Sequence, residues 1–160
     1  MAHTLILLRH AKSDWSGLES DVDRPLARRG LRQAPGTGKW LAAHVDRIDL
    51  AVVSTAVRAR TTWDLVAAEL GVAPPARLED DAYAASADEL LAIVRSLDEW
   101  LGTVVLVGHN PGLEDLAETL TGEDVRLPTS AVAVIELDDR WLDAARAQAR
   151  LVTAGRPPAT

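Results

Sequence analysis

The 160-residue chain contains no cysteine, and this absence excludes disulfide frameworks, thiolate zinc sites, iron–sulfur clusters and a cysteine nucleophile. Phenylalanine is absent too, and the only aromatic residues are five tryptophans and one tyrosine, so the core must consist mainly of leucine, valine, alanine and isoleucine. No apolar run reaches the roughly 18 residues that cross a membrane. The amino-terminal residues show neither the basic segment nor the cleavage site of a signal peptide. We therefore expect a cytoplasmic protein without a membrane span.

Positive charge is scarce, because 17 lysine and arginine residues stand against 24 aspartate and glutamate residues, which gives a net charge of −7. An acidic chain argues against non-specific nucleic-acid binding. Apolar residues make up 48% of the sequence, which excludes disorder for most of the chain, and the length is that of one domain with its own core. We expect a single domain over residues 1–154 and a flexible tail over residues 155–160.

Short continuous apolar runs are typical of strands that are buried on both faces of a parallel sheet. Between these runs, apolar residues recur at helical spacing. The pattern predicts strands over residues 4–8, 50–54, 103–107 and 131–137, and a weaker fifth over residues 149–153. It predicts helices over residues 26–45, 59–70, 87–101 and 111–121. Strands separated by helices give a three-layer α/β/α sandwich with a mostly parallel central sheet.

Capping residues refine the expected helix boundaries. Ser86 and Glu89 form the pattern of a capping box, and Asn110 followed by Pro111 is typical of an N-cap and a first helical residue. The first helix contains Pro35 and two nearby glycines, so we expect it to be kinked or split there. Candidate stops after the other three helices are Gly71, Gly102 and Gly122.

Arginines and histidines follow three of the predicted strands. Arg9 and His10 follow the first strand, Arg58 the second and His109 the third. Ligands of such sheets bind beyond the carboxyl ends of the strands, so these side chains should meet at one edge. Arginine forks match phosphate oxygens, and a neutral imidazole is a nucleophile or base near pH 7. Any one of these residues alone would more often be structural, as we expect of the other two histidines, but their convergence predicts a site for a phosphate-sized anion.

Several segments of the chain resemble a known family. Residues 7–15 (LLRHAKSDW) resemble the Arg-His-Gly/Ala signature of the histidine phosphatase superfamily, the phosphoglycerate mutase-like proteins. Residues 54–62 (STAVRARTT) resemble its second arginine motif, with Thr55 where proline is common, and residues 107–112 (VGHNPG) resemble its second histidine motif. The segments that are similar, more narrowly, to the small bacterial phosphohistidine phosphatases are residues 9–13, 23–30, 109–113 and 127–131.

The resemblance implies a role for each matched residue. His10 would attack phosphorus and become a phosphohistidine, while Arg9 and Arg58 would hold phosphoryl oxygens. His109 would complete the pocket and stabilise charge on the transferring group. Phosphoryl transfer depends on positioning and on positive charge at the phosphoryl oxygens. Because the arginines supply that charge, we expect no metal ion and no cofactor.

Two further residues are candidates for phosphate contact. Ser13 would donate a hydrogen bond to a phosphoryl oxygen. Asn110 is a second candidate, although we favour the interpretation that it only caps its helix.

The proton donor is the open question of the site. Superfamily members that cleave phosphate esters generally take it from the segment after the second helix, which here reads Glu79-Asp80-Asp81 and lacks the Glu-x-x-x-Gly context of the mutase-like members. We interpret this segment as a solvated loop, with Asp80 or Asp81 as the alternative donors. A phosphohistidine needs a donor less, because its imidazole leaves readily once protonated. The short chain also leaves little room for a cap over the site.

These observations predict a metal-independent phosphatase that acts through phospho-His10 on phosphohistidine in a partner protein. Three alternatives stay open. The same chemistry on a small phosphate ester or acyl phosphate is the first, and a non-catalytic phospho-ligand module is the second. The third is a metal hydrolase that uses His10 and His109 together with nearby carboxylates. The expected partner is a phosphorylated protein side chain or a small phospho-compound, and the expected assembly is a monomer or a weak homodimer.

Overall fold

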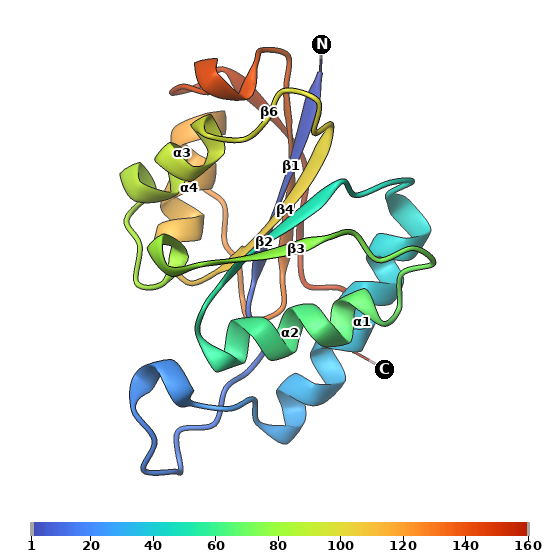
Figure 1. Ribbon diagram of the computed structural model, residues 1–160, viewed down its shortest axis with the longest axis vertical. Coiled ribbons are helices and arrows are strands. Elements are labelled where there is room, and N and C mark those ends of the chain that lie inside the picture. Colours follow the sequence, from blue (N-terminus) through green and yellow to red (C-terminus); the bar gives the residue numbers. More distant parts are fainter. Residues whose placement is uncertain (1, 160) are drawn as a thin grey trace.

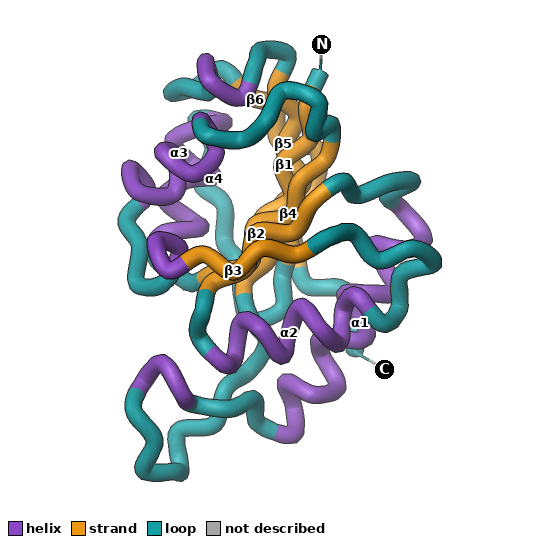
Figure 2. Tube along the Cα trace, viewed as in Figure 1, coloured by secondary structure: helices purple, strands orange, loops and turns teal. Residues whose placement is uncertain are grey.

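The computed structural model describes residues 2–159, in which one six-stranded sheet lies between two layers of helices (Figures 1 and 2). The strands are β1 (His3–Arg9), β2 (Leu50–Ser54), β3 (Ala76–Glu79), β4 (Thr103–Gly108), β5 (Val132–Leu137) and β6 (Ala149–Gly155). The α-helices are α1 (Arg28–His44), α2 (Val57–Ala67), α3 (Ala87–Arg95) and α4 (Gly112–Thr121). Single 3-10 turns are η1 (Asp21–Asp23), η2 (Asp80–Ala82) and η3 (Trp141–Asp143).

The strand order is β3-β2-β4-β1-β5-β6. The first four strands of that order pair in parallel, whereas β5 is antiparallel to both of its neighbours. The chain between β5 and β6 contains only the η3 turn, and a connection without a crossover helix suits an antiparallel pair. Figure 1 shows α1 and α2 on one side of the sheet and α3 and α4 on the other. The predicted three-layer sandwich with a mostly parallel sheet is confirmed.

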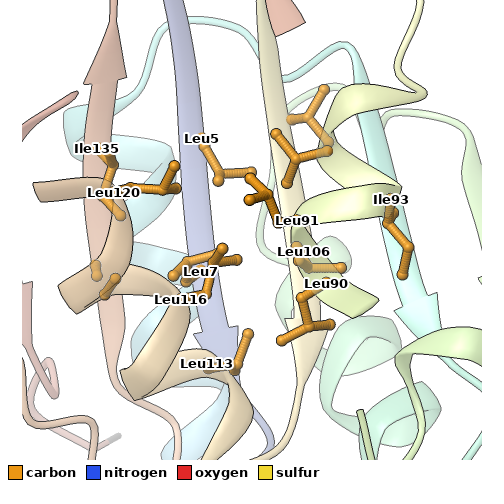
Figure 3. Packing of buried hydrophobic residues seen from close by; sticks show 14 of the residues in the cluster. Leu5, Leu7, Leu90, Leu91, Ile93, Leu106, Leu113, Leu116, Leu120 and Ile135 are labelled. Carbon is orange, nitrogen blue, oxygen red and sulfur yellow. The ribbon is translucent and has the colours of Figure 1, made fainter. Parts of the chain in front are cut away.

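Two separate apolar cores lie on the two faces of the sheet. Leu5 and Leu7 of β1 pack against α3 and α4, whose leucines surround them in Figure 3. Ile6 and Leu8 belong to the core on the opposite face, with α1 and α2. Successive side chains of a strand point to opposite faces, so a central strand between two helical layers must be apolar throughout. This explains the continuous apolar run that predicted β1.

The helix α1 is continuous, so of the predicted kink or split near Pro35 the split is wrong. The glycines that follow the proline do not interrupt the helix but face its neighbours. A β-carbon on Gly36 would lie 2.1 Å from the carbonyl oxygen of Pro158, and one on Gly38 would lie 2.6 Å from that of Val66. These glycines allow close packing, and the tertiary contacts offset their low helix propensity.

Part of the segment predicted as a flexible tail contacts the rest of the chain, and its last residue, Thr160, lies outside the described residues. Gly155, which was expected in a flexible tail, is the last residue of β6, and Pro157 beyond it is buried. Pro158 lies over Gly36 of α1, as described above. The boundary expected at residue 154 therefore falls inside a strand. The proline-rich segment belongs to no helix or strand, but the backbone of Pro158 lies against Gly36 of α1.

The predicted caps are correct at two of the helix ends. Ser86 and Glu89 form the capping box of α3, with both reciprocal hydrogen bonds present. Gly122 ends α4 in the left-handed conformation.

Three other helix boundaries differ from the prediction. The helix α3 ends at Arg95 rather than near residue 101, because the buried leucines that suggested a longer helix lie in the following turns. The helix α2 ends at Ala67, before the expected stop at Gly71. The helix α4 begins at Gly112, and Asn110 does not cap it.

The strand β3 was not predicted. It is an edge strand that pairs in parallel with β2, and three of its four residues are exposed. Such a strand lacks the apolar run that marks the buried strands. Of the helices within residues 2–159, none combines the length and the hydropathy needed to span a bilayer.

Candidate active site

The carboxyl ends of β1, β2 and β4 bring the predicted residues together. His10 follows β1 and His109 follows β4, and their ring centroids lie 5.1 Å apart. Arg58 lies in the first turn of α2, directly after β2, and is buried together with His10. The parallel pairing of β4 with both β1 and β2 places these three ends side by side. The strand topology therefore builds the site that the spacing of motifs predicted.

His10 is held as a neutral ring with one nitrogen free. Its Nδ1 lies 2.7 Å from the carbonyl oxygen of Ala11, which can only accept, so Nδ1 carries the proton and donates it. The other nitrogen, Nε2, then keeps its lone pair. Burial is the main cause that lowers the pKa of His10 to about 3, and the nearby His109 and Arg58 lower it further. A neutral imidazole with a free Nε2 is the form that attacks phosphorus.

Side chains of α1 and α2 fix the backbone that follows His10. The amide of Ala11 donates to Oγ1 of Thr62 at 2.9 Å, and the amide of Lys12 donates to Oε1 of Gln33 at 2.9 Å. Thr62 in turn donates to the carbonyl oxygen of Arg58 at 2.7 Å. One buried threonine thus ties the loop of the candidate nucleophile to the backbone of the arginine.

His109 is oriented by Ser54, a residue to which sequence reasoning assigned no role. Oγ of Ser54 lies 2.7 Å from Nε2 of His109 and also accepts the amide of Ala56 at 3.3 Å. Burial and, next, Arg58 lower the pKa of His109 to about 4, so the ring is neutral at pH 7. If the Ser54 hydroxyl donates to Nε2, the proton of the neutral ring sits on Nδ1. Ser54 is the last residue of β2, and this position at the carboxyl end of a strand could have indicated its place in the site.

The carbonyl oxygen of Leu127 holds two of the predicted residues. It accepts from Nη1 of Arg9 at 3.1 Å and from Nδ2 of Asn110 at 2.8 Å. The amide of Leu127 donates to a carboxylate oxygen of Glu114 at 2.7 Å, which anchors this turn on α4. Asn110 therefore reaches across to the segment before β5 instead of capping α4, which corrects its expected role.

Four buried polar atoms around His10 find no partner within residues 2–159. They are Nε of Arg9, Nε of Arg58, Nδ1 of His109 and Oδ1 of Asn110. Buried polar groups are normally paired, so each unpaired one needs an explanation. Two of these atoms belong to cationic guanidinium groups. Together with the neutral His10, these groups form a cluster suited to an anion of phosphate size, and we call its members the pocket residues.

Ser13 is buried, but its environment is more complex than that of a free phosphate donor. Its hydroxyl accepts a hydrogen bond from Nη1 of Arg24 at 2.8 Å. The Arg24 guanidinium also lies 3.4 Å over the Trp15 ring and pairs with Asp21 at 3.1 Å. Arg24 belongs to a segment that carried the family resemblance, yet sequence reasoning gave it no role, and nothing in the sequence singled out Asp21.

The expected solvated loop is found for two of the three consecutive acids but not for the first of them. Glu79 is the last residue of β3 and is half-buried, with Arg77 3.8 Å away. Asp80 and Asp81 are exposed in the η2 turn. The structure gives neither aspartate a hydrogen bond from its side chain to the residues of the pocket. The carboxylates that the metal-hydrolase alternative requires do not gather here either, since residues 2–159 hold no group of three or more histidine, aspartate or glutamate side chains arranged to bind a metal.

The low pKa of His10 leads to a prediction about pH. We expect the His10 ring to stay neutral down to about pH 4, and the acid limb of kcat/KM to lie well below the ordinary histidine pKa of about 6.5. Between about pH 6.5 and 3, His10 is protonated in the unfolded chain but neutral in the folded protein. Folding stability should therefore fall as the pH drops from about 6.5 toward 3. NMR titration of labelled histidine rings would measure the midpoint. A midpoint near 6.5 for His10 would contradict the buried, neutral ring.

Comparisons with known proteins agree with this geometry. The family model of the histidine phosphatase superfamily (branch 1) matches residues 5–82. An uncharacterised protein of Mycobacterium tuberculosis is 34% identical over 156 residues, which cover 91% of this chain and 96% of that protein. The SixA structure from Nakamurella multipartitia has a TM-score of 0.87 at 31% identity and covers 98% of this chain and 97% of its own. The SixA structure from Agrobacterium tumefaciens has a TM-score of 0.83 at 30% identity, with coverage of 97% and 98%. This chain is therefore a phosphatase of the histidine phosphatase superfamily and belongs to its small SixA-like branch.

Proposed function

We propose that the protein is a metal-independent phosphohistidine phosphatase with His10 as its nucleophile. Nε2 of His10 attacks phosphorus while the bond from phosphorus to the imidazole nitrogen of the substrate breaks. The leaving ring takes a proton from solvent and departs as neutral imidazole. Water then attacks phospho-His10, which releases inorganic phosphate and restores the free ring. The SixA structures from Nakamurella multipartitia and Agrobacterium tumefaciens are those of proposed phosphohistidine phosphatases, which supports this substrate.

The observation that carries the proposal is the set of unpaired donors around a neutral His10. Nε of Arg9, Nε of Arg58 and Nδ1 of His109 can each donate to a phosphoryl oxygen. Such donors act on the charge of the transferring group, where electrostatic stabilisation contributes most. A non-catalytic binding module would need the donors but not a nucleophile with its lone pair held free by Ala11.

We favour phosphohistidine over a phosphate ester because neither candidate acid lies where it could protonate an ester leaving group. An alkyl ester leaves as an alkoxide and needs an acid within hydrogen-bond reach, which is typically worth about 10²–10⁴-fold in rate. Asp80 and Asp81 are exposed on the η2 turn, and the structure gives their side chains no hydrogen bond to the pocket residues. A phosphohistidine does not need this acid. Its distal ring nitrogen is protonated by solvent, so the exposed aspartates are dispensable for that substrate.

The substrate preference can be tested with two conservative variants. We expect Asp80→Asn and Asp81→Asn each to change phosphohistidine hydrolysis by less than about tenfold, well short of a general-acid effect. We also expect the unmodified enzyme to prefer phosphohistidine over simple alkyl phosphates by a large margin in kcat/KM. Steady-state hydrolysis of both substrates measures this. A steep loss in either variant, or comparable rates on alkyl phosphates, would replace phosphohistidine with a small ester as the substrate.

A further inference from the structure

One carboxylate outside the predicted set contacts three side chains at the site. Asp21 belongs to the η1 turn, in the segment between β1 and α1 that Figure 1 shows beyond the ends of the strands. Its side chain pairs with Arg58 at 3.1 Å and with Arg24 at 3.1 Å. It also accepts a hydrogen bond from the hydroxyl of Tyr83, whose ring contacts the His109 ring edge-on at 5.6 Å.

The contacts with Arg58 have a defined geometry. Nη1 of Arg58 donates to the carbonyl oxygen of Asp21 at 2.6 Å, and Nη2 donates to Oδ2 at 3.1 Å. Both contacts use the terminal nitrogens of the guanidinium group. The Nε–H is left unpaired and buried. A guanidinium group presents several N–H donors in a rigid plane, so holding the terminal nitrogens also fixes the direction of the Nε edge.

We propose that Asp21 is a positioning residue, which holds the Arg58 guanidinium so that its Nε edge faces the phosphoryl group. This role rests on the proposed phosphoryl site at His10 but not on the identity of the leaving group. Asp21 acts through Arg58 and does not touch the substrate. The hydrogen bond from Tyr83 and the two arginines lower the pKa of Asp21. The carboxylate therefore stays charged, and stays paired with Arg58, throughout the working pH range.

The opposite role would have the opposite effect. If Asp21 were an internal anion that competes with phosphate for Arg58, removing its charge would strengthen phosphate binding. If it orients Arg58, removing the carboxylate leaves only the backbone contact with Nη1, so the guanidinium can pivot about that contact and phosphate binding weakens. The sign of the change in the phosphate dissociation constant therefore separates the two roles.

The test uses the full chain with Asp21→Ala and Asp21→Asn, and Asp23→Ala as the matched control. Asp23 lies in the same η1 turn and is exposed, and within residues 2–159 its side chain pairs only with the Ser20 hydroxyl. We expect Asp21→Ala to weaken binding of inorganic phosphate about tenfold and to lower kcat/KM for an aryl phosphate by a similar factor, as the loss of a charge-assisted hydrogen bond does. Asp21→Asn should lose less, because its amide oxygen still accepts a hydrogen bond. Asp23→Ala should change neither quantity.

A double-mutant cycle on kcat/KM distinguishes positioning from general structural support. If Asp21 acts through Arg58, adding Asp21→Ala to Arg58→Ala should cause little further loss. An equal loss from Asp21→Ala in both backgrounds would show a structural role. Tighter phosphate binding by Asp21→Ala or Asp21→Asn would show competition. Either result overturns the proposal. Both readouts use phosphate or an aryl phosphate, so they stay valid if phosphohistidine proves not to be the substrate.

Discussion

Replacing His10 with alanine is expected to abolish turnover, with a loss of roughly 10⁴-fold or more, as for the removal of a covalent nucleophile. Its Nε2 is the nitrogen left free by the bond from Nδ1 to Ala11, so no other ring takes over the attack. His109 lies nearby, but its Nε2 is engaged by Ser54. Quenching the unmodified enzyme in base during turnover of an aryl phosphate should trap a phosphoenzyme that survives base and is lost in acid, and the variant should lack it.

A second histidine serves as the control for this experiment. His44 is exposed near the end of α1, where it stacks on the Trp40 ring. We expect His44→Ala to retain full activity and to form the phosphoenzyme normally. Trapped phosphate on His10→Ala would mean that another residue is the nucleophile.

Replacing Arg58 with alanine is expected to lower kcat/KM by about 10²–10³-fold, the usual effect of removing one preorganised donor from a developing negative charge. The side chain is buried, and its Nε is unpaired at the pocket, so solvent cannot replace its charge there. The variant should also bind inorganic phosphate more weakly, because the guanidinium group of Arg58 holds the phosphoryl oxygens in the ground state as well as in the transition state.

Another arginine of the same helix is the matched control. Arg60 lies two positions further along α2 and is exposed. We expect Arg60→Ala to change kcat/KM by less than about twofold, as for a typical exposed substitution. Equal losses for the two arginines would mean that the positive potential of the whole helix, and not the Arg58 donor, is what matters.

Much of the fold was predictable because the buried strands have a distinctive pattern of apolar residues. A strand between two helical layers is apolar on both faces, so β1, β2, β4 and β5 appear in the sequence as uninterrupted apolar runs. The edge strand β3 is exposed and has no such run, and it was missed. Pro35 and the glycines of α1 predicted an interrupted helix for a related reason. Local propensity records the cost of Gly36 in a helix but not the contact with Pro158 that requires it.

The site residues that lie at the carboxyl ends of strands could be predicted from the sequence. His10 and His109 directly follow strands, and Arg58 begins a helix that follows a strand, so their convergence follows from topology. Asn110 was assigned to a cap because its partner, Leu127, is distant in sequence. Asp21 could not be predicted, since an aspartate in an acidic surface segment is ordinarily solvated. Only the folded chain brings it to Arg58.

The position of β1 in the sheet has a consequence for how the chain is made. This first strand pairs on one side with residues 103–108 and on the other with residues 132–137. The ribosome makes this strand before both of its partners, so its two edges stay unpaired until residues 132–137 have been synthesised. Closing such long loops is slow, so catalytic activity should appear only in nascent chains that extend beyond residue 137. Chains released before β5 would leave one edge of β1 open, which makes them prone to aggregation and candidates for chaperone binding.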